Sequence, residues 1–285
     1  MPHPTEILPT ARGRALLWRP ARPAPGAPAL LLLHGAAGGA WMWCEGFAAR
    51  LAEAGWLVAA LDLRRRRADG AEASLADYAA DARAALAALR RPALLVGHSL
   101  GGLLAQRLLA EPAVRGAALL APVPPEGLWW SSLRLVALDP LLAHGVARMA
   151  DGGAHGASPA GLGAARAALR AALFHPDLPE ATALRHLRRL TRESAVAVLE
   201  AQAPQPLLPA ALLGRPVLAV ARAGDRLIPA DTVLRTAAFH GAAATLFDGP
   251  GHAMMLDLDW RDIADHLLGW AARQPRLAPA EALVP

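Results

Sequence analysis

The apolar and polar positions of the chain alternate between strand-like and helix-like patterns. Short, continuous apolar runs are typical of strands buried on both faces, and four of them occur in the first half, at 29–33, 57–61, 93–96 and 116–121. The segments between them have helical periodicity, at 43–54, 74–90 and 100–110. Because strands and helices alternate at this spacing, the first half predicts βαβ crossovers and a parallel sheet.

The alternation stops at the proline-rich segment 122–125, and only helical patterns follow to about residue 205. It then resumes with a strand, a helix, a strand and a last helix, at 217–221, 230–239, 243–247 and 258–273.

This pattern predicts an α/β fold in a single domain, residues 1–285, with a mostly parallel central sheet flanked by helices. We expect its core to span about 1–122 and 206–285 and a helical lid to be inserted at about 123–205.

Composition narrows the function classes. The chain has 285 residues, 54% of them hydrophobic, which suffices for one large core. All 29 basic residues are arginines, so a Walker phosphate loop, a lysine Schiff base and a serine–lysine dyad are excluded. A net charge of +5 is small for a chain of this length, so we expect no nucleic-acid partner. A single cysteine, Cys44, excludes an internal disulfide, and the histidines have no metal-site spacing, so we expect no metal.

The beginning of the chain bears on its location. Prolines and charges interrupt residues 1–20, so they contain no apolar core of a signal peptide. The run at 29–33 is too short to span a bilayer. We therefore expect a cytoplasmic protein without stable membrane insertion. The sequence leaves the oligomeric state open, a homodimer included.

The segment 97–101 reads Gly-His-Ser-Leu-Gly and lies between a predicted strand and a predicted helix. In that context Gly-x-Ser-x-Gly is the pattern of a nucleophile elbow, which exposes the serine on a sharp turn at the end of a strand. The helix that follows points its N–H groups and the positive end of its dipole at negative charge forming there. The pattern predicts Ser99 as a nucleophile rather than as part of a plain turn.

A serine hydroxyl is a poor nucleophile until a base takes its proton, and an acid usually orients that base. In this type of site the acid and then the histidine follow the serine along the chain, each just past a strand. Asp225 and His252 occupy these positions and are the predicted acid and base. The other candidates for the acid are Asp248, Asp257 and Glu126.

Two aimed N–H groups are needed to stabilise the oxyanion of an acyl transfer. One is expected from Leu100, which follows the nucleophile, and the other from Ala36 in the glycine-rich loop 34–41. A phosphate cradle would need a Walker lysine or a clear Gly-x-Gly-x-x-Gly register, and this loop has neither.

Three large apolar side chains are candidates for contact with a substrate. Trp129 and Trp130 begin the helical segment and either line an apolar acyl pocket or pack the lid onto the core. Met254 follows His252 and is assigned to the pocket wall or to the core. The four arginines at 64–67 either attract an anionic substrate or form a solvated loop, the usual role of a short charge run.

Together these motifs resemble those of α/β-hydrolase-fold serine hydrolases. The resemblance covers about 30–122 and 206–273. The motifs on which it rests are HGAAGGAW at 34–41, GHSLGG at 97–102, GDRLIP at 224–229 and GPGH at 249–252. It implies a triad of Ser99, Asp225 and His252, an oxyanion hole of Ala36 and Leu100, and no cofactor.

The segment 34–41 is similar to the HG-x-x-x-GAW start of plant methylesterases and hydroxynitrile lyases. Hydroxynitrile lyases with this start rely on an active-site lysine, which the chain lacks. A second departure is at 62–70, where the family often has D-x-R-G-x-G and this chain has lost the glycine turn.

The expected function is hydrolysis of a small-molecule carboxylic ester with a small or medium hydrophobic acyl group, through an acyl-enzyme. The same groups can cleave a lactone, an amide or a C–C bond, or transfer an acyl group, and the sequence does not separate these reactions. The alternative from another class is a non-catalytic ligand-binding protein on a hydrolase scaffold. Such proteins often lose a member of the triad, and here all three residue types are present.

Overall fold

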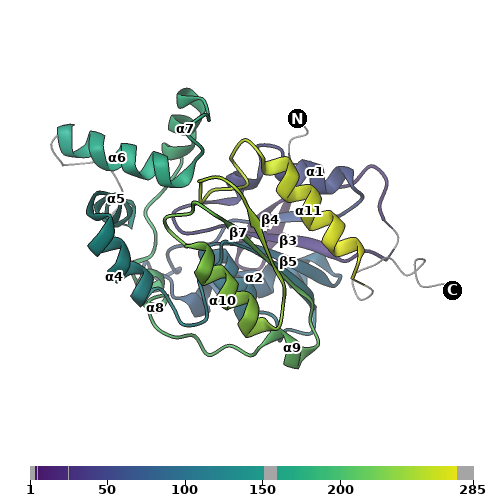
Figure 1. Cartoon of the computed structure of the whole chain (residues 1–285). Helices are drawn as coiled ribbons and strands as arrows, with labels where there is room; N and C mark the ends of the chain where they lie inside the picture. Colours follow the sequence, from purple (N-terminus) through teal and green to yellow (C-terminus); the bar gives the residue numbers. More distant parts are fainter. Residues whose placement is uncertain (1–3, 5, 25, 151–158, 275–285) are drawn as a thin grey trace.

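The computed structural model describes residues 4, 6–24, 26–150 and 159–274. At its centre is an eight-stranded sheet in the order β1-β2-β4-β3-β5-β6-β7-β8 (Figure 1). The strands are β1 (Glu6–Thr10), β2 (Gly13–Trp18), β3 (Ala29–Leu33), β4 (Val58–Leu61), β5 (Ala93–His98), β6 (Val114–Leu120), β7 (Val217–Arg222) and β8 (Ala244–Phe247). Strand β2 pairs antiparallel with β1 and with β4, and the other neighbours pair in parallel.

The helices follow the alternation with the strands. They are η1 (a 3-10 helix, Ala40–Trp43), α1 (Phe47–Glu53), α2 (Leu75–Leu89), α3 (Leu100–Arg107), α4 (Trp129–Leu138), α5 (Pro140–Ala150), α6 (Pro159–Leu173), α7 (Glu180–Leu187), α8 (Ala195–Glu200), α9 (Ala210–Leu213), α10 (Ala230–His240) and α11 (Trp260–Ala272).

The α/β class and the mostly parallel sheet are confirmed, and each strand predicted from an apolar run is present. Within the predicted helix at 43–54, the structure has α1 over Phe47–Glu53, and Trp43 is instead the last residue of η1. The hairpin of β1 and β2 was not predicted. Strand β1 is at the edge of the sheet, is only partly buried and contains Pro9, so its sequence has no apolar run.

The sheet is covered on both faces, which explains its continuous apolar strands. In β3, Leu30 and Leu32 belong to a core with residues of α1, α10 and α11, whereas Leu31 and Leu33 pack with residues of α2 and α3. Alternate residues of a strand point to opposite faces, so both sets are buried. Helices α1 and α11 lie side by side on the first face (Figure 1).

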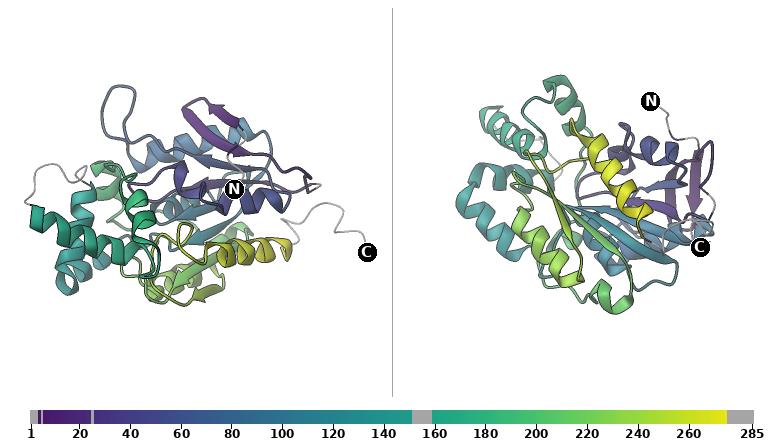
Figure 2. Two further views of the ribbon diagram at one scale, coloured as in Figure 1. Left: turned by 90° about the horizontal axis from the view of Figure 1, so that it is seen from above. Right: turned by 45° about the vertical axis from the view of Figure 1, so that its right-hand side comes forward.

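Between β6 and β7 the described residues contain helices α4 to α9 and irregular segments, but no strand. Figure 2 shows α4, α5 and α6 gathered at one end of the molecule, beside the sheet rather than on one of its two faces. We call residues 123–205 the helical insertion. Its place lets it cover the edge of the sheet where the parallel strands end.

A buried histidine makes the stability of this fold depend on pH. His240 Nδ1 accepts a hydrogen bond from the N–H of Ala210 at 3.1 Å, and Nε2 lies 3.1 Å from Gln106 Oε1. This arrangement requires the neutral ring, and burial lowers the pKa of His240 to about 4. The unfolded chain binds a proton near pH 6.5, so the stabilisation is fully present above that pH and is lost as the pH falls towards 4.

We expect the free energy of unfolding to fall between pH 7 and pH 4, with up to about 3 kcal/mol of the fall due to this residue. Urea unfolding across this range should give a shallower pH dependence for His240→Gln than for the unchanged protein. His144→Gln, which replaces an exposed histidine, is the matched control. Equal pH slopes in all three proteins would contradict the assignment.

Candidate active site

Four segments of the predicted site follow the carboxyl ends of parallel strands. The loop 34–41 follows β3, Ser99 follows β5, Asp225 comes after β7 and His252 comes after β8. Strands β3, β5, β6, β7 and β8 are consecutive neighbours in the sheet, so their carboxyl ends share one edge. Open α/β sheets bind their ligands at this edge.

Ser99 occupies a strained turn between β5 and α3. Its φ is 53° and its ψ is −116°, a backbone conformation that residues other than glycine rarely adopt. Among the described residues, the other non-glycine positions with positive φ include Ala37 and Ala121, which are also at this edge. Backbone strain of this kind costs about 1–3 kcal/mol per residue and gathers at functional sites.

Close packing beneath the turn explains its glycines. A Cβ on Gly101 would lie 2.2 Å from the carbonyl oxygen of Leu33, so α3 can approach β3 only if this residue has no side chain. A Cβ on Gly35 would lie 3.0 Å from Ser99 Cβ, and the loop after β3 is therefore in contact with the serine.

His252 and Asp225 form a buried pair. The His252 Nδ1 lies 2.7 Å from Asp225 Oδ2, and both side chains are almost completely buried. Asp225 Oδ1 accepts hydrogen bonds from the N–H groups of Leu227 and Ile228, at 2.8 and 3.0 Å. The carboxylate is held by three contacts, and it favours the tautomer with the proton on Nδ1. Nε2 then carries the lone pair that a general base needs.

The other candidate acids have different partners. Asp257 accepts from the N–H groups of His175 and Leu258, and burial raises the pKa of this carboxyl group. Glu126 pairs with Arg235, and Asp248 is exposed.

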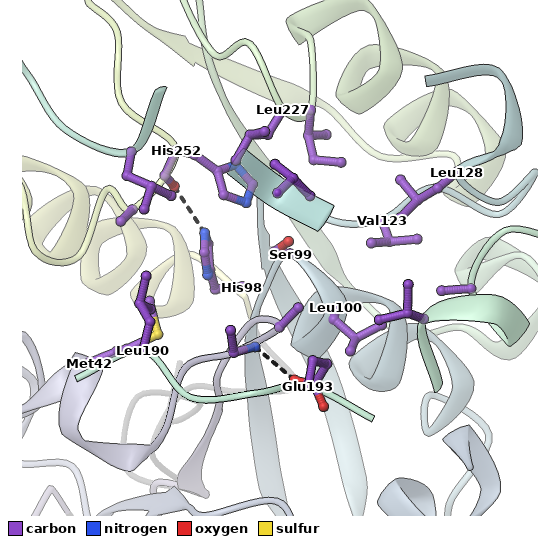
Figure 3. A pocket seen from close by; sticks show the side chains of 18 of the residues that line it. Met42, His98, Ser99, Leu100, Val123, Leu128, Leu190, Glu193, Leu227 and His252 are labelled. Carbon is purple, nitrogen blue, oxygen red and sulfur yellow. Dashed lines mark hydrogen bonds between the residues drawn. The ribbon is translucent and has the colours of Figure 1, made fainter. Parts of the chain in front are cut away.

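The backbone around His252 is held from two directions. The N–H of His252 donates to the carbonyl of Ala172 at 2.9 Å, at the end of α6. His98 Nε2 lies 2.9 Å from the His252 carbonyl oxygen (Figure 3). Burial, and then the neighbouring His252, lower the pKa of His98 well below its usual value, so His98 is neutral and donates this bond. Sequence reasoning missed His98, although it occupies the variable position of the Gly-x-Ser-x-Gly pattern.

The segments meet at a cavity with a volume of about 190 Å³. Figure 3 shows the hydroxyl of Ser99 and the ring of His252 pointing into it. Ala36 and Leu100 also line it, as their predicted roles require. The first N–H groups of a helix have no acceptor within the helix, so Leu100 at the start of α3 has a free donor to offer.

Helix α4 turns a different face to the cavity than the sequence suggested. Ser131, Ser132 and Leu135 of α4 line it together with Leu128, the residue just before the helix, at the spacing of one helical face. Trp129 and Trp130 lie on the outer face, 61% and 71% exposed.

Met254 is also absent from the cavity wall, because it is completely buried in the core on the side of α11. None of Trp129, Trp130 and Met254 is thus in the cavity wall, which on this side is formed by residues of α4 and of other segments of the insertion.

The arginines at 64–67 differ among themselves, and two of them are not simply solvated. Arg64 bonds to the buried Asp81, 2.7 Å away, and the hydrogen bond raises the pKa of Arg64. Arg65 donates to the carbonyl of Gly38 in the loop after β3. Arg66 and Arg67 are exposed, as expected for a charged loop.

Among residues 4, 6–24, 26–150 and 159–274, no cluster of three or more His, Cys, Asp or Glu side chains could hold a metal ion. Nor does any helix in this part of the chain have the length and apolar character needed to span a membrane.

Comparison with known proteins identifies the family. A profile described as "Alpha/beta hydrolase family" matches residues 30–266. The chain belongs to the alpha/beta hydrolase family. The match begins in β3 and ends in α11, so it includes every strand from which the site is built. A search of curated proteins found no match to the chain.

Solved structures with this fold are similar over most of their length. An esterase from Rhodococcus sp. ECU1013 is 22% identical with a TM-score of 0.66, and the alignment covers 93% of this chain and 97% of that one. A protein described as an N-acyl homoserine lactone degrading enzyme is 18% identical, with coverage of 93% and 100% and a TM-score of 0.62. A monoacylglycerol lipase from Paleococcus ferrophilus is 17% identical, with coverage of 89% and 97% and a TM-score of 0.59. At these identities the likeness shows the alpha/beta hydrolase fold.

Proposed function

We propose that the protein is a serine hydrolase that cleaves a carboxylic ester with a small or medium hydrophobic acyl group. The observation that carries the proposal is the His252–Asp225 pair, 2.7 Å apart, beside a serine on a strained elbow, at the wall of one cavity. Ser99 is the nucleophile, His252 the general base and Asp225 the residue that orients it. The esterase and lipase among the similar structures support this reaction class.

The reaction proceeds in two steps. Ser99 Oγ attacks the carbonyl carbon while His252 Nε2 takes its proton, and the N–H groups of Ala36 and Leu100 stabilise the oxyanion. When the ester bond breaks, His252 gives its proton to the departing alkoxide, which leaves as an alcohol. Water then attacks the acyl-enzyme, again with His252 as base, and releases the carboxylic acid and Ser99. No cofactor takes part.

The cavity sets the expected substrate size. Its lining is mainly apolar, and its volume of about 190 Å³ is below the ~300 Å³ at which typical ligand pockets begin. The helical insertion forms much of its wall, with Leu128, Leu135 and Phe174 among the contacts. We infer that the insertion is the lid over the acyl site and that acyl chains of short or medium length fit best.

Labelling with a fluorophosphonate probe tests the nucleophile directly. We expect the purified protein to be modified stoichiometrically at Ser99, as located by peptide mass spectrometry, and Ser99→Ala to stay unlabelled. A series of nitrophenyl esters from acetate to palmitate should give the highest kcat/KM for short or medium chains. A folded protein that stays unlabelled, or is labelled at another residue, would refute the proposal and favour a ligand-binding role.

A further inference from the structure

One carboxylate of the helical insertion reaches the loop that supplies the predicted oxyanion donor. Glu193 is 3% exposed and lines the same cavity as Ser99. Its Oε2 accepts a hydrogen bond of 2.7 Å from the N–H of Ala37, which is drawn as a dashed line in Figure 3. The two residues are 156 positions apart in the chain, so this bond joins the insertion to the loop after β3.

The insertion binds Ala37 on both sides of its backbone. While the N–H of Ala37 donates to Glu193, its carbonyl accepts a 2.9 Å hydrogen bond from the N–H of Thr191. Ala37 has a φ of 58°, which is unfavourable for any residue other than glycine. These two bonds stabilise a conformation that the loop would not favour by itself.

The bonds to Ala37 bear on Ala36, the residue before it. A peptide plane is rigid, so holding the N–H of Ala37 fixes the plane that follows Ala36. On the other side, the carbonyl oxygen of Gly35 accepts a 3.2 Å hydrogen bond from the N–H of Gly38 and lies 2.8 Å from His34 Nδ1. This carbonyl shares its rigid peptide plane with the N–H of Ala36. The peptide planes on both sides of Ala36 are therefore held by hydrogen bonds, those of the loop itself before it and those of the insertion after it.

The buried carboxylate of Glu193 is surrounded by hydrogen-bond donors and a guanidinium group. Oε1 accepts hydrogen bonds from the Tyr78 hydroxyl and from the N–H of Ser194, the latter at 2.8 Å. Arg65 Nε lies 3.6 Å from Oε2. Buried carboxylates are stable when they are paired and hydrogen-bonded, and this one has three donors and a guanidinium group. Glu193 has no contact with the His252–Asp225 pair and lies on the far side of Ser99 from His252 (Figure 3).

We propose that Glu193 is a positioning residue for the oxyanion hole. It holds the 34–41 loop so that the Ala36 N–H points at the developing oxyanion. The helical insertion then has two roles, because it encloses the acyl group and also completes the catalytic geometry. This inference rests on the proposed ester hydrolysis by Ser99.

Glu193→Gln tests the role with little change in volume. The N–H of Ser194 and the hydroxyl of Tyr78 favour the amide oxygen at the Oε1 position, so the amide NH₂ faces the N–H of Ala37 and that bond is lost. Oxyanion donors act in the transition state, and losing one costs about 10²–10³ in kcat. Because misplacing a donor removes only part of its effect, we expect kcat to fall about 10- to 100-fold with little change in KM.

Two matched variants separate positioning from general loss of stability. Tyr78→Phe removes a bond to Oε1 and leaves the acceptor for Ala37 in place. Glu200→Gln alters a similar bond elsewhere, since Glu200 in the insertion accepts from the N–H of Leu75 at 2.7 Å. Glu200→Gln should keep kcat within about threefold of the unchanged protein, and Tyr78→Phe should lose less than Glu193→Gln, whatever their melting temperatures. All rates are measured below the unfolding transition of each variant.

The pH profile of kcat is an additional readout. Because Glu193 does not touch the histidine or its acid, Glu193→Gln should lower the plateau and leave the shape of the profile unchanged. If Glu193→Gln does not fold, Glu193→Asp is the second variant. Its shorter side chain withdraws the acceptor from Ala37, so kcat should again fall with little change in KM.

The outcomes distinguish the positioning role of Glu193 from the proposed hydrolysis by Ser99. An unchanged kcat in the folded Glu193 variant, a rise in KM alone, or an equal loss in Glu200→Gln would overturn the positioning role and leave the proposed hydrolysis intact. A parent protein that neither reacts with the fluorophosphonate nor hydrolyses any ester overturns both proposals. A selective loss of kcat in the Glu193 variant supports both.

Discussion

Replacing Ser99 with alanine is expected to lower kcat for the best ester about 10⁶-fold, the scale of loss when a triad loses its nucleophilic serine. The acyl-enzyme can no longer form, so only the oxyanion donors and substrate binding still promote attack by water. KM should change little, because the apolar wall that binds the acyl group is untouched. Steady-state kinetics with a nitrophenyl ester, at high protein concentration, measures the loss.

Ser131→Ala is the matched control for this prediction. Ser131 lines the same cavity from α4 but is not on the elbow, so its hydroxyl should contribute little to the rate. Alanine at position 99 keeps a Cβ at the same strained φ of 53°, and we expect the melting temperature to be preserved. Similar activities of Ser99→Ala and the unchanged protein would mean that another residue is the nucleophile.

The parts of the site that are local in sequence could be predicted. Ser99 lies between an apolar run and a helical pattern, and these neighbours alone identify the elbow. Asp225 and His252 each come within a few residues of a strand end. Since the strands are parallel, their carboxyl ends lie at one edge of the sheet, so placement along the chain was enough to bring the two residues together.

Contacts between distant segments could not be predicted in the same way. Glu193 lies in the sequence Arg-Glu-Ser, which matches no motif, and its partner Ala37 lies in the run of glycines and alanines at 35–40, which has no polar side chain. Only the folded chain shows that a helical insertion supplies the acceptor. Arg65 escaped prediction for the same reason, because its partner is a backbone carbonyl, that of Gly38.

The error over Trp129 and Trp130 has a different origin. Residue size suggested that these side chains were buried, but helical phase places Leu128, Ser131, Ser132 and Leu135 on the other face of α4. That second face is less apolar and was overlooked. The face of α4 toward the cavity contains two serines, so the rule that the most apolar side of a helix is buried does not predict which face that is.

Asp225→Asn is expected to lower kcat about 10⁴-fold while the geometry of the site is preserved. The two N–H groups of Leu227 and Ile228 bind Oδ1, so the carbonyl oxygen of an asparagine takes that position. The amide NH₂ then faces His252 Nδ1 and can only donate to it. The imidazole is forced into the tautomer with its proton on Nε2, which cannot accept a proton from Ser99.

Asp248→Asn provides the comparison, since Asp248 precedes His252 by four residues but its side chain is exposed. It should retain full kcat, whereas Asp225→Asn should bind substrate with a similar KM and turn it over slowly. Imidazole nitrogen chemical shifts measured by NMR should report the proton on Nε2 in Asp225→Asn and on Nδ1 in the unchanged protein. If the tautomer were unaltered while kcat fell, the role of Asp225 would be to stabilise the charged imidazolium in the transition state rather than to select the neutral ring that starts the reaction.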